Sequence, residues 1–176
     1  NRALILIGFF GAMRRSELAA LTWEDITFER DGMLIVLPRS KTDQRGEGQR
    51  IAIPIGSDGR CPLRTLLAWR QACKVTEGPV FRRLSKTGTV LKPGISALYV
   101  NHLVHQLAGE AGLLHPELYS AHSLRRGFAT EAARMGASMT SIKNHGRWES
   151  TKTVIEYIEE GRQYSDSAVN VLFDFR

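Results

Sequence analysis

His122 and Arg125, a histidine and an arginine three residues apart, form the most chemically suggestive pair in this sequence. On a helix, or in its first turn, residues with this separation share a face. A guanidinium binds two phosphate oxygens through a fixed fork of donors, and an imidazole exchanges protons near neutral pH. The pair suits the chemistry of a phosphate ester. Seen alone, it also fits a surface histidine beside a solvated arginine.

A second pair, Arg14 and Glu17, has the same separation. A carboxylate beside an arginine fixes the direction of the guanidinium and offsets the cost of removing it from water. The alternative for this pair is an ordinary ion pair on a helix surface.

Three further positions complete the set of candidates. Trp148 has an indole N–H that can donate a hydrogen bond, and Tyr157 follows it by nine residues. A tyrosine hydroxyl becomes a nucleophile when a neighbouring group removes its proton. Lys41 lies in a polar loop between two expected strands. Each has a structural alternative: a core tryptophan, a half-buried tyrosine and a solvated lysine.

The order of these candidates along the chain, in their local contexts, resembles the tyrosine recombinase (phage integrase) family: Arg14, Lys41, His122, Arg125, Trp148 and Tyr157. The first family block reads glycine, a hydrophobic residue, then R-x-S-E-L-x-x-L, and residues 12–21 match it with Ala12 at the glycine. The H-x-L-R block is matched by the segment that starts at His122. In the last block, tyrosine follows a His or Trp by nine residues.

Two departures concern that last block. Trp148 stands where many members have His, which favours a Cre-like subset with Trp at this motif. Arg147 is inserted between Gly146 and Trp148 relative to the commonest glycine–histidine pattern. The spacing to Tyr157 assigns the position to Trp148, because counting from Arg147 gives ten residues. His145 is a competing imidazole, but it lies twelve residues before the tyrosine.

The resemblance implies a mainly α catalytic-domain fold with a small antiparallel β-sheet (α+β). It also implies the function of a site-specific recombinase or integrase. Such an enzyme is expected to use neither metal nor ATP nor another cofactor. In such an enzyme Tyr157 attacks a DNA phosphodiester and forms a 3′-phosphotyrosyl link, which a second 5′-hydroxyl later reseals. Arg14 and Arg125 are expected to stabilise the phosphate charge. Lys41 is the candidate general acid for the leaving oxygen.

The resemblance also assigns roles to the remaining candidates. His122 is expected to act as base or hydrogen-bond partner for the Tyr157 hydroxyl. Trp148 is expected to donate to the phosphate and to pack against the tyrosine helix. Glu17 is expected to orient Arg14. The sequence contains no spacing typical of a metal site, such as HExxH or a Cys/His cluster.

Double-stranded DNA is the expected partner. The formal net charge of +6 and the pI near 9.7 are weak indications of nucleic-acid binding. Six basic residues are candidate contacts to the DNA backbone, with solvated surface charges as the alternative: Arg39, Arg45, Arg50, Lys86, Lys92 and Arg126. In relatives, a C-terminal segment docks on a neighbouring protomer of a tetramer. The apolar tail in residues 158–176 is therefore a candidate docking segment, with packing on its own domain as the alternative.

Three rival functions remain open. A type IB topoisomerase resembles this family in its Arg-Lys-Arg-His-Tyr set, but the short chain and the R-x-S-E-L block favour a recombinase. A second rival is a DNA-binding relative without catalysis, against which all six positions are filled by competent residues. The third is an unrelated basic, helical phosphate-binding enzyme.

The elements that must position these residues are mainly helices. Their expected bounds are residues 3–13, 16–21, 63–73 with Pro62 at the first position, 96–111, 123–135, 139–145, 151–159 and a last helix within 166–173. Alternating apolar residues and an Asp31-Gly32 turn predict antiparallel strands at 26–28, 33–37 and 50–54. Residues 80–84 form a short segment without a firm assignment.

Composition and length fit one catalytic domain over residues 1–176. The chain is 43% hydrophobic and 24% charged, which is typical of a globular protein and not of a disordered one. It begins without Met, so we expect a fragment that lacks the family's N-terminal DNA-clamping domain. The longest apolar run, residues 3–10, is too short to cross a membrane. Cys61 and Cys73 are expected to be buried thiols, in keeping with a cytoplasmic protein.

Overall fold

The computed structural model describes residues 1–37 and 48–173. Lys41, Arg39 and Arg45, three of the candidate residues, lie outside this described part. The helices are α1 (Arg2–Phe10), α2 (Arg15–Ala20), α3 (Pro62–Cys73), α4 (Ala97–Glu110), α5 (Ala121–Arg134), α6 (Met139–Gly146), α7 (Thr151–Arg162) and α8 (Asn170–Phe173), with short 3₁₀ turns at Trp23–Asp25 and Pro116–Leu118. The strands are β1 (Ile26–Glu29), β2 (Gly32–Leu37), β3 (Gln49–Pro54), β4 (Arg82–Leu84) and β5 (Val90–Gly94).

The predicted α+β fold class, with its small antiparallel sheet, is confirmed. Strands β1, β2 and β3 pair in chain order, and Ile35 lies opposite both Ile26 and Ile51. These three isoleucines are buried, so one face of the sheet contributes to the main core. Pro62 begins α3, as expected for a residue that has no N–H to leave unpaired.

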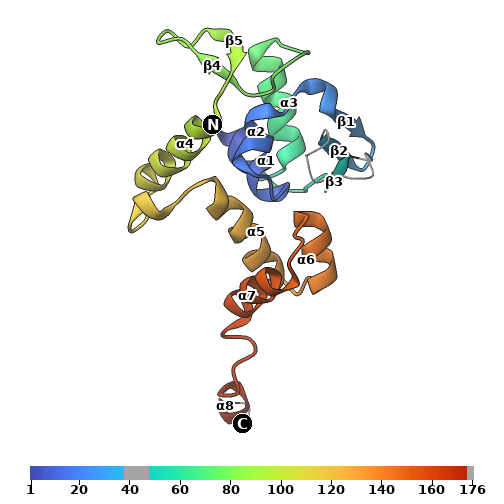
Figure 1. Ribbon diagram of the computed structural model, residues 1–176, viewed down its shortest axis with the longest axis vertical. Coiled ribbons are helices and arrows are strands. Elements are labelled where there is room, and N and C mark those ends of the chain that lie inside the picture. The colour runs from blue at the N-terminus through green and yellow to red at the C-terminus, as the bar shows by residue number, and fades with distance from the viewer. Residues whose placement is uncertain (38–47, 174–176) are drawn as a thin grey trace.

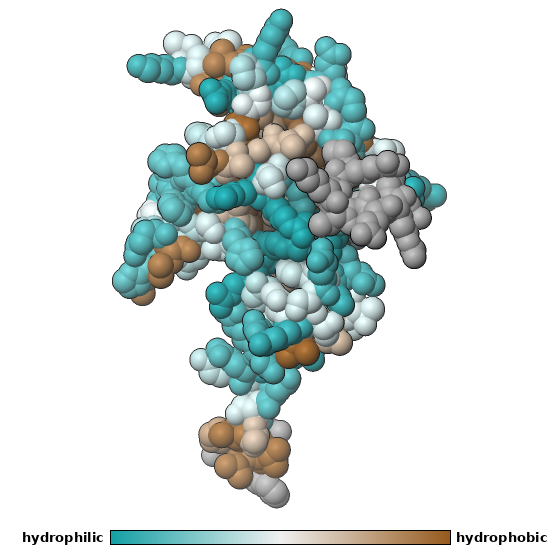
Figure 2. Space-filling model, in the orientation of Figure 1, coloured by the Kyte–Doolittle hydropathy of each residue, from teal (hydrophilic) through white to brown (hydrophobic). Residues whose placement is uncertain are grey.

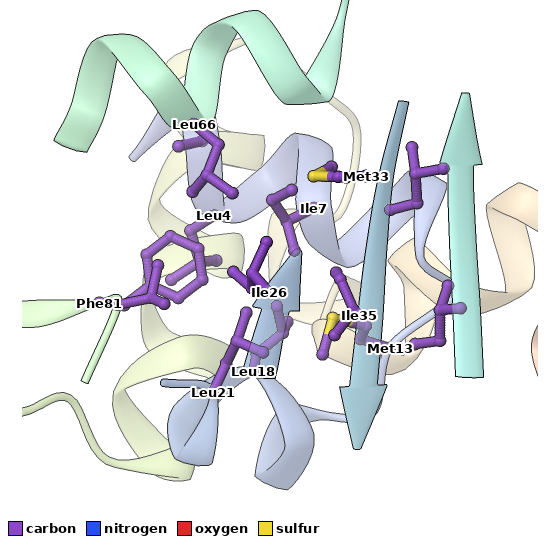
Figure 3. Close-up of a cluster of buried hydrophobic side chains, with 14 of the residues drawn as sticks. Leu4, Ile7, Met13, Leu18, Leu21, Ile26, Met33, Ile35, Leu66 and Phe81 are labelled. Atoms are coloured by element: carbon purple, nitrogen blue, oxygen red, sulfur yellow. The ribbon is translucent and has the colours of Figure 1, made fainter. Parts of the chain in front are cut away.

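The main core lies where α1 packs against α3 and the sheet covers their side. Figure 3 shows its side chains converging from helices and strands that are distant in the sequence. Ile7, Leu18 and Leu66 are fully buried there. Each buried side chain of this size contributes about 1.5–3 kcal/mol to stability. Cys61 and Cys73 are both buried and not disulfide-bonded, as expected.

A smaller apolar cluster joins α5, α6 and α7, which lie below the main core in Figure 1. Its buried members include Ala129, Ala133, Ile142, Val154 and Tyr157. Small residues on α5 let α7 approach closely. Helix α1 contacts both α3 and α5, so it connects the two clusters. The candidate residues belong to elements of both clusters.

Several predicted bounds are wrong in their details. Helix α1 ends at Phe10 instead of residue 13, because Ala12 adopts a left-handed conformation with φ of 44°. Helix α5 begins two residues earlier than predicted, because Ser120 caps it by accepting a hydrogen bond from the His122 N–H. Helix α6 includes Gly146 as its last residue, and the left-handed residue that follows it is Arg147. We expected Gly146 to stop it.

The hairpin of β4 and β5 was not predicted as such. Its strands are short and largely exposed, so they lack the apolar alternation from which strands are recognised. The last helix, α8, covers only part of the predicted segment and stands away from the rest of the chain (Figure 1). In the described part of the chain no helix is long and apolar enough to cross a membrane.

Candidate active site

A cavity of about 490 Å³ is lined by residues from the start of α2, from α5 and from α7. Five of the six candidate catalytic residues line it: Arg14, His122, Arg125, Trp148 and Tyr157. Its other lining residues are Met13, Arg15, Ser16, Asn101, Ser120 and Thr153. Residues from the two ends of the chain are thus brought to one place. The sixth candidate, Lys41, lies outside the described residues.

Arg125 is the most deeply buried charged residue of those that line the cavity. Its side chain is 4% exposed, and a terminal N–H donates to the carbonyl oxygen of Ala12. Burial lowers the pKa of this guanidinium to about 10, with a further contribution from the positive charges of Arg14 and Arg147. A pKa near 10 still leaves Arg125 cationic at neutral pH. The site therefore holds a desolvated positive charge in a fixed position.

Arg14 precedes the first residue of α2 and is paired with Glu17. Its Nη1 lies 2.6 Å from Glu17 Oε1, and its backbone N–H donates to Oε2 at 2.8 Å. The Glu17 side chain is only 14% exposed, whereas that of Arg14 is 46% exposed. The carboxylate thus sits behind the guanidinium, which remains open to solvent. This is the arrangement expected for a residue that orients Arg14.

The pKa of Glu17 reflects competing effects. Burial raises it, but the charge of Arg147 and the backbone and side-chain hydrogen bonds of Arg14 outweigh burial. The net effect is a pKa below the ordinary value of a glutamate. Glu17 is therefore ionised at neutral pH, and one negative charge lies among three guanidiniums.

The Tyr157 hydroxyl lies 3.3 Å from Nε2 of His122. His122 is in the first turn of α5 and Tyr157 is on α7, so the close packing of these two helices sets the distance. The tyrosine side chain is 9% exposed. The imidazole can accept the hydroxyl proton from this position, because 3.3 Å is close to hydrogen-bonding distance in a site without bound substrate.

Trp148 lies between Arg125 and Tyr157. The Arg125 guanidinium carbon is 4.3 Å from the centre of the indole ring, and the rings of Trp148 and Tyr157 meet edge to face at 5.8 Å. Gly146 leaves the space that the indole occupies, since a Cβ there would lie closer than 3.0 Å to three ring atoms. The tryptophan is therefore in contact with both the arginine and the tyrosine.

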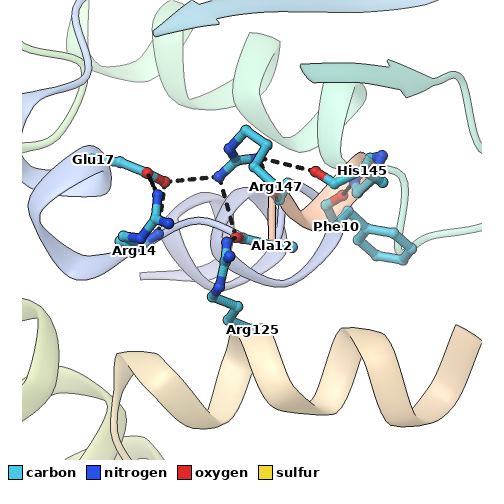
Figure 4. A network of polar contacts seen from close by, with 8 residues as sticks. Phe10, Ala12, Arg14, Glu17, Arg125, His145 and Arg147 are labelled. Carbon is cyan, nitrogen blue, oxygen red and sulfur yellow. Dashed lines mark hydrogen bonds and ion pairs between the residues drawn. The ribbon is translucent and has the colours of Figure 1, made fainter. Parts of the chain in front are cut away.

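Arg147 is a site residue that sequence reasoning missed. It was considered only as a competitor for the motif position, yet its side chain is 6% exposed and lies 2.8 Å from Glu17 Oε2. Figure 4 shows it between Glu17 and the turn at Ala12. His145, the other competitor, points elsewhere: its Nε2 donates to the carbonyl of Phe10 at 2.7 Å, and its ring stacks on Phe128.

The described candidates for DNA contact are spread over different elements. Arg50 is exposed on β3, and Lys86 and Lys92 are exposed in the β4–β5 hairpin. Arg126 is exposed on α5, but it makes a bidentate ion pair with Glu160 of α7. Arg126 must therefore break or share that pair to contact a phosphate.

The arrangement as a whole suits an anion. Arg14, Arg125 and Arg147 carry three positive charges and Glu17 carries one negative charge, so the group has an excess of positive charge beside the cavity. Among residues 1–37 and 48–173 no cluster of His, Cys, Asp or Glu could hold a metal ion. The chemistry open to these side chains is electrostatic stabilisation of an anion beside a tyrosine nucleophile.

The chain is similar to known integrases and recombinases. Residues 1–163 match the model of the phage integrase family. The chain is 38% identical over 175 residues to the integrase/recombinase xerD homolog of Selenomonas ruminantium, covering 99% of this chain and 51% of that protein. It is 26% identical over 188 residues to the recombinase cre of Escherichia phage P1, covering 99% of this chain and 53% of that protein. The chain thus spans about half the length of these curated relatives.

The fold is shared with solved recombinase structures. The XerH site-specific recombinase, in a post-cleavage complex bound to its palindromic difH substrate, superposes with a TM-score of 0.71. The two sequences are 21% identical, and the match covers 98% of this chain and 45% of that one. At this identity the likeness shows a common fold.

Proposed function

Because the chain belongs to the phage integrase family, we propose that it is the catalytic domain of a site-specific tyrosine recombinase that cleaves and rejoins double-stranded DNA. One observation carries the proposal. The Tyr157 hydroxyl lies 3.3 Å from His122 Nε2 at the edge of a cavity that is also lined by Arg14 and Arg125. A nucleophile, a proton acceptor and two phosphate-binding groups thus face one space.

The proposed reaction is a transesterification. The Tyr157 oxygen attacks the scissile phosphorus while His122 takes the phenolic proton. The bond from phosphorus to the 5′-oxygen breaks, and Lys41 protonates this leaving oxygen. The product is a 3′-phosphotyrosyl ester and a free 5′-hydroxyl. Reversal with the 5′-hydroxyl of a partner strand reseals the DNA, and the ester retains the bond energy, so no ATP is consumed.

The two arginines stabilise the charge that develops on the phosphate. Arg125 is held by the Ala12 carbonyl and Arg14 by Glu17, so both are positioned before substrate binds. A preorganised donor of this kind contributes on the order of 10²–10³-fold in rate. Trp148, stacked on Arg125 and in contact with Tyr157, is proposed to serve at the third motif as in a Cre-like subset.

The proposed domain is one part of a longer protein. An N-terminal domain would clamp the DNA, and basic residues such as Arg50, Lys86 and Lys92 would contact phosphates. Binding of this sort weakens steeply with salt. The tail after α7 is proposed to dock on a neighbouring protomer when a tetramer assembles on DNA. Figure 2 shows apolar surface concentrated on α8, where Leu172 is 71% and Phe173 is 74% exposed.

Tyr157→Phe tests the proposed function. The protein that carries its DNA-clamping domain is incubated with a nicked duplex chosen from a random pool for tight binding, and the covalent adduct is resolved on a denaturing gel. The unmodified protein should form an adduct that Tyr157→Phe cannot form, while both bind the duplex equally. Tyr164→Phe is the matched control, because Tyr164 is 81% exposed and lies outside the cavity.

The same experiment, together with an assay on supercoiled plasmid that carries two copies of the selected site, separates the rival functions. Tight binding without any adduct from the unmodified protein would contradict catalysis and favour a DNA-binding relative. An adduct accompanied by relaxation of supercoiled plasmid, without strand exchange between two sites, would favour a topoisomerase. An adduct that persists in Tyr157→Phe would refute the assignment of the nucleophile.

A further inference from the structure

The guanidinium of Arg147 makes several polar contacts, although the proposed reaction assigns this residue no role. Its Nη1 donates to the carbonyl oxygens of Gly11 at 3.2 Å and His145 at 3.0 Å. Its Nη2 donates to the Ala12 carbonyl at 3.3 Å and to Glu17 Oε2 at 2.8 Å. The side chain is 6% exposed and does not line the cavity. A phosphate in that cavity is therefore bound by other residues.

The backbone of Arg147 has an unfavourable conformation for a residue with a side chain. The residue has a φ of 58°, in the left-handed region, where a side chain costs about 1–2 kcal/mol relative to glycine. This conformation ends α6 and turns the chain so that the next residue, Trp148, packs over Arg125. Glycine would permit the same turn without the conformational cost. The contacts of the guanidinium offset that cost.

The two oxygens of Glu17 are shared between two arginines. Oε1 accepts from the Arg14 guanidinium, whereas Oε2 accepts from the Arg147 guanidinium and from the backbone N–H of Arg14. Figure 4 shows the two guanidiniums on either side of the carboxylate. A carboxylate paired with Arg14 alone would orient the guanidinium but would also cancel its positive charge. With Arg147 on the second oxygen, the three groups together keep a charge of one positive unit. The group that presents Arg14 to the cavity therefore keeps a net positive charge while Glu17 still holds Arg14 in place.

We propose that Arg147 is a positioning residue, which neutralises Glu17 from its second oxygen so that Arg14 is held in place without losing its attraction for phosphate. The inference rests on the proposed function, since it concerns how the same site binds its anion. It assigns to Arg147 an electrostatic role in addition to holding the turn at Gly11 and Ala12 against the end of α6.

A charge-cancelling pair of variants tests this role. Arg147→Gln removes the positive charge and leaves the Glu17 charge unbalanced beside Arg14. The first-order rate of adduct formation on saturating nicked DNA should fall on the order of 10- to 100-fold, the range seen when a group that orients a ligand-binding residue is removed. The Kd for DNA should change little, because DNA affinity is spread over many phosphate contacts and the cavity holds only one of them. Adding Glu17→Gln to this variant should restore the rate by several-fold.

The restored rate separates electrostatics from simple loss of structure. The double variant has fewer ionic hydrogen bonds than Arg147→Gln, so a purely structural role predicts a rate that is equal or lower. That result, or an unchanged rate in Arg147→Gln, would overturn the proposal. Arg82→Gln is the matched control, because Arg82 also donates to two backbone carbonyls, those of Pro79 and Glu77, but its hydrogen bonds do not reach Glu17, so the adduct rate should stay unchanged.

A measurement without DNA keeps this test distinct from that of the proposed function. Inorganic phosphate is titrated into each variant by calorimetry. Its Kd should rise in Arg147→Gln and fall back towards the original value in the double variant. If the unmodified protein forms no adduct, the proposed function fails, and the phosphate affinities still decide the role of Arg147. Equal affinities in all variants would refute that role.

Discussion

Gly146→Ala tests whether the space beneath Trp148 is essential to the site. A Cβ at residue 146 would lie closer than 3.0 Å to the Cζ3, Cε3 and Cη2 atoms of Trp148, a separation that real Cβ atoms essentially never show. The obstacle is a rigid ring held between Arg125 and Tyr157, so it cannot yield as the end of a flexible side chain can. Either Trp148 leaves its position or the end of α6 shifts.

The expected cost is one of two alternative penalties, less the helix propensity that alanine gains over glycine. Forcing an extra methyl group into a packed site costs about 1–3 kcal/mol. If Trp148 leaves instead, its cation–π contact with Arg125 is lost, at about 1–2 kcal/mol. Replacing glycine by alanine within a helix returns up to about 1 kcal/mol, and less at the last residue of α6. The net loss is therefore about 1–2 kcal/mol, which lowers Tm by about 2–8 °C at this chain length.

Thermal unfolding and adduct formation measure the two consequences. Gly146→Ala should unfold at lower temperature, and its rate of adduct formation should fall at least about tenfold, because Trp148 no longer packs on Tyr157. Gly127→Ala is the matched control. It lies within α5, and an added Cβ would be 3.5 Å from Phe9, an ordinary contact. The control should be as stable as the unmodified protein, or more stable by up to about 1 kcal/mol.

An unchanged Tm and an unchanged adduct rate in Gly146→Ala would refute this reasoning. They would mean that the indole does not occupy the space over Gly146. Equal Tm values for Gly146→Ala and Gly127→Ala would refute it as well, since the specific clash with Trp148 would then explain nothing.

Two further predictions concern α7 and the histidine behind the site. Gly161→Ala should slow adduct formation with little change in DNA binding. The added Cβ would lie closer than 3.0 Å to the Thr130 carbonyl oxygen and would push α7 away from α5. Equal adduct rates in the variant and the unmodified protein would contradict this prediction. Burial lowers the pKa of His145, its hydrogen bond to Phe10 raises it, and the charge of Arg147 lowers it, with a net lowering from 6.5. The unfolded chain therefore binds this proton more readily, so the free energy of unfolding should fall as pH drops through about 6.5. Urea unfolding of the unmodified protein and His145→Gln at pH 8 and pH 5.5 checks this, and an equal pH dependence in both would contradict it.

Local signals predicted most of the helices and the three-stranded sheet. Pro62 at the first position of α3 acts through its own backbone, so its effect can be recognised without knowledge of the fold. The predicted bounds failed where a distant contact or an unusual backbone intervened. Helix α1 stops short because of the left-handed turn at Ala12, whose carbonyl receives hydrogen bonds from Arg125 and Arg147.

The candidate site, too, was predicted from the sequence only in part. The resemblance identified Arg14, His122, Arg125, Trp148 and Tyr157 by type and spacing, and the structure places all five around one cavity. Arg147 escaped notice because its partners Gly11, Ala12 and Glu17 are more than a hundred residues away in the chain. No local pattern distinguishes a buried arginine of this kind from a solvated one.

The sequence by itself determined which residue types are present, their order, and the helices and strands that carry them, because these depend on side-chain chemistry and on neighbours within a few residues. Only the tertiary structure decided that α5 and α7 place His122 beside Tyr157, and that one carboxylate serves two arginines. Such contacts depend on how far apart packed helices lie and on which groups lose water together. Both are properties of the folded chain.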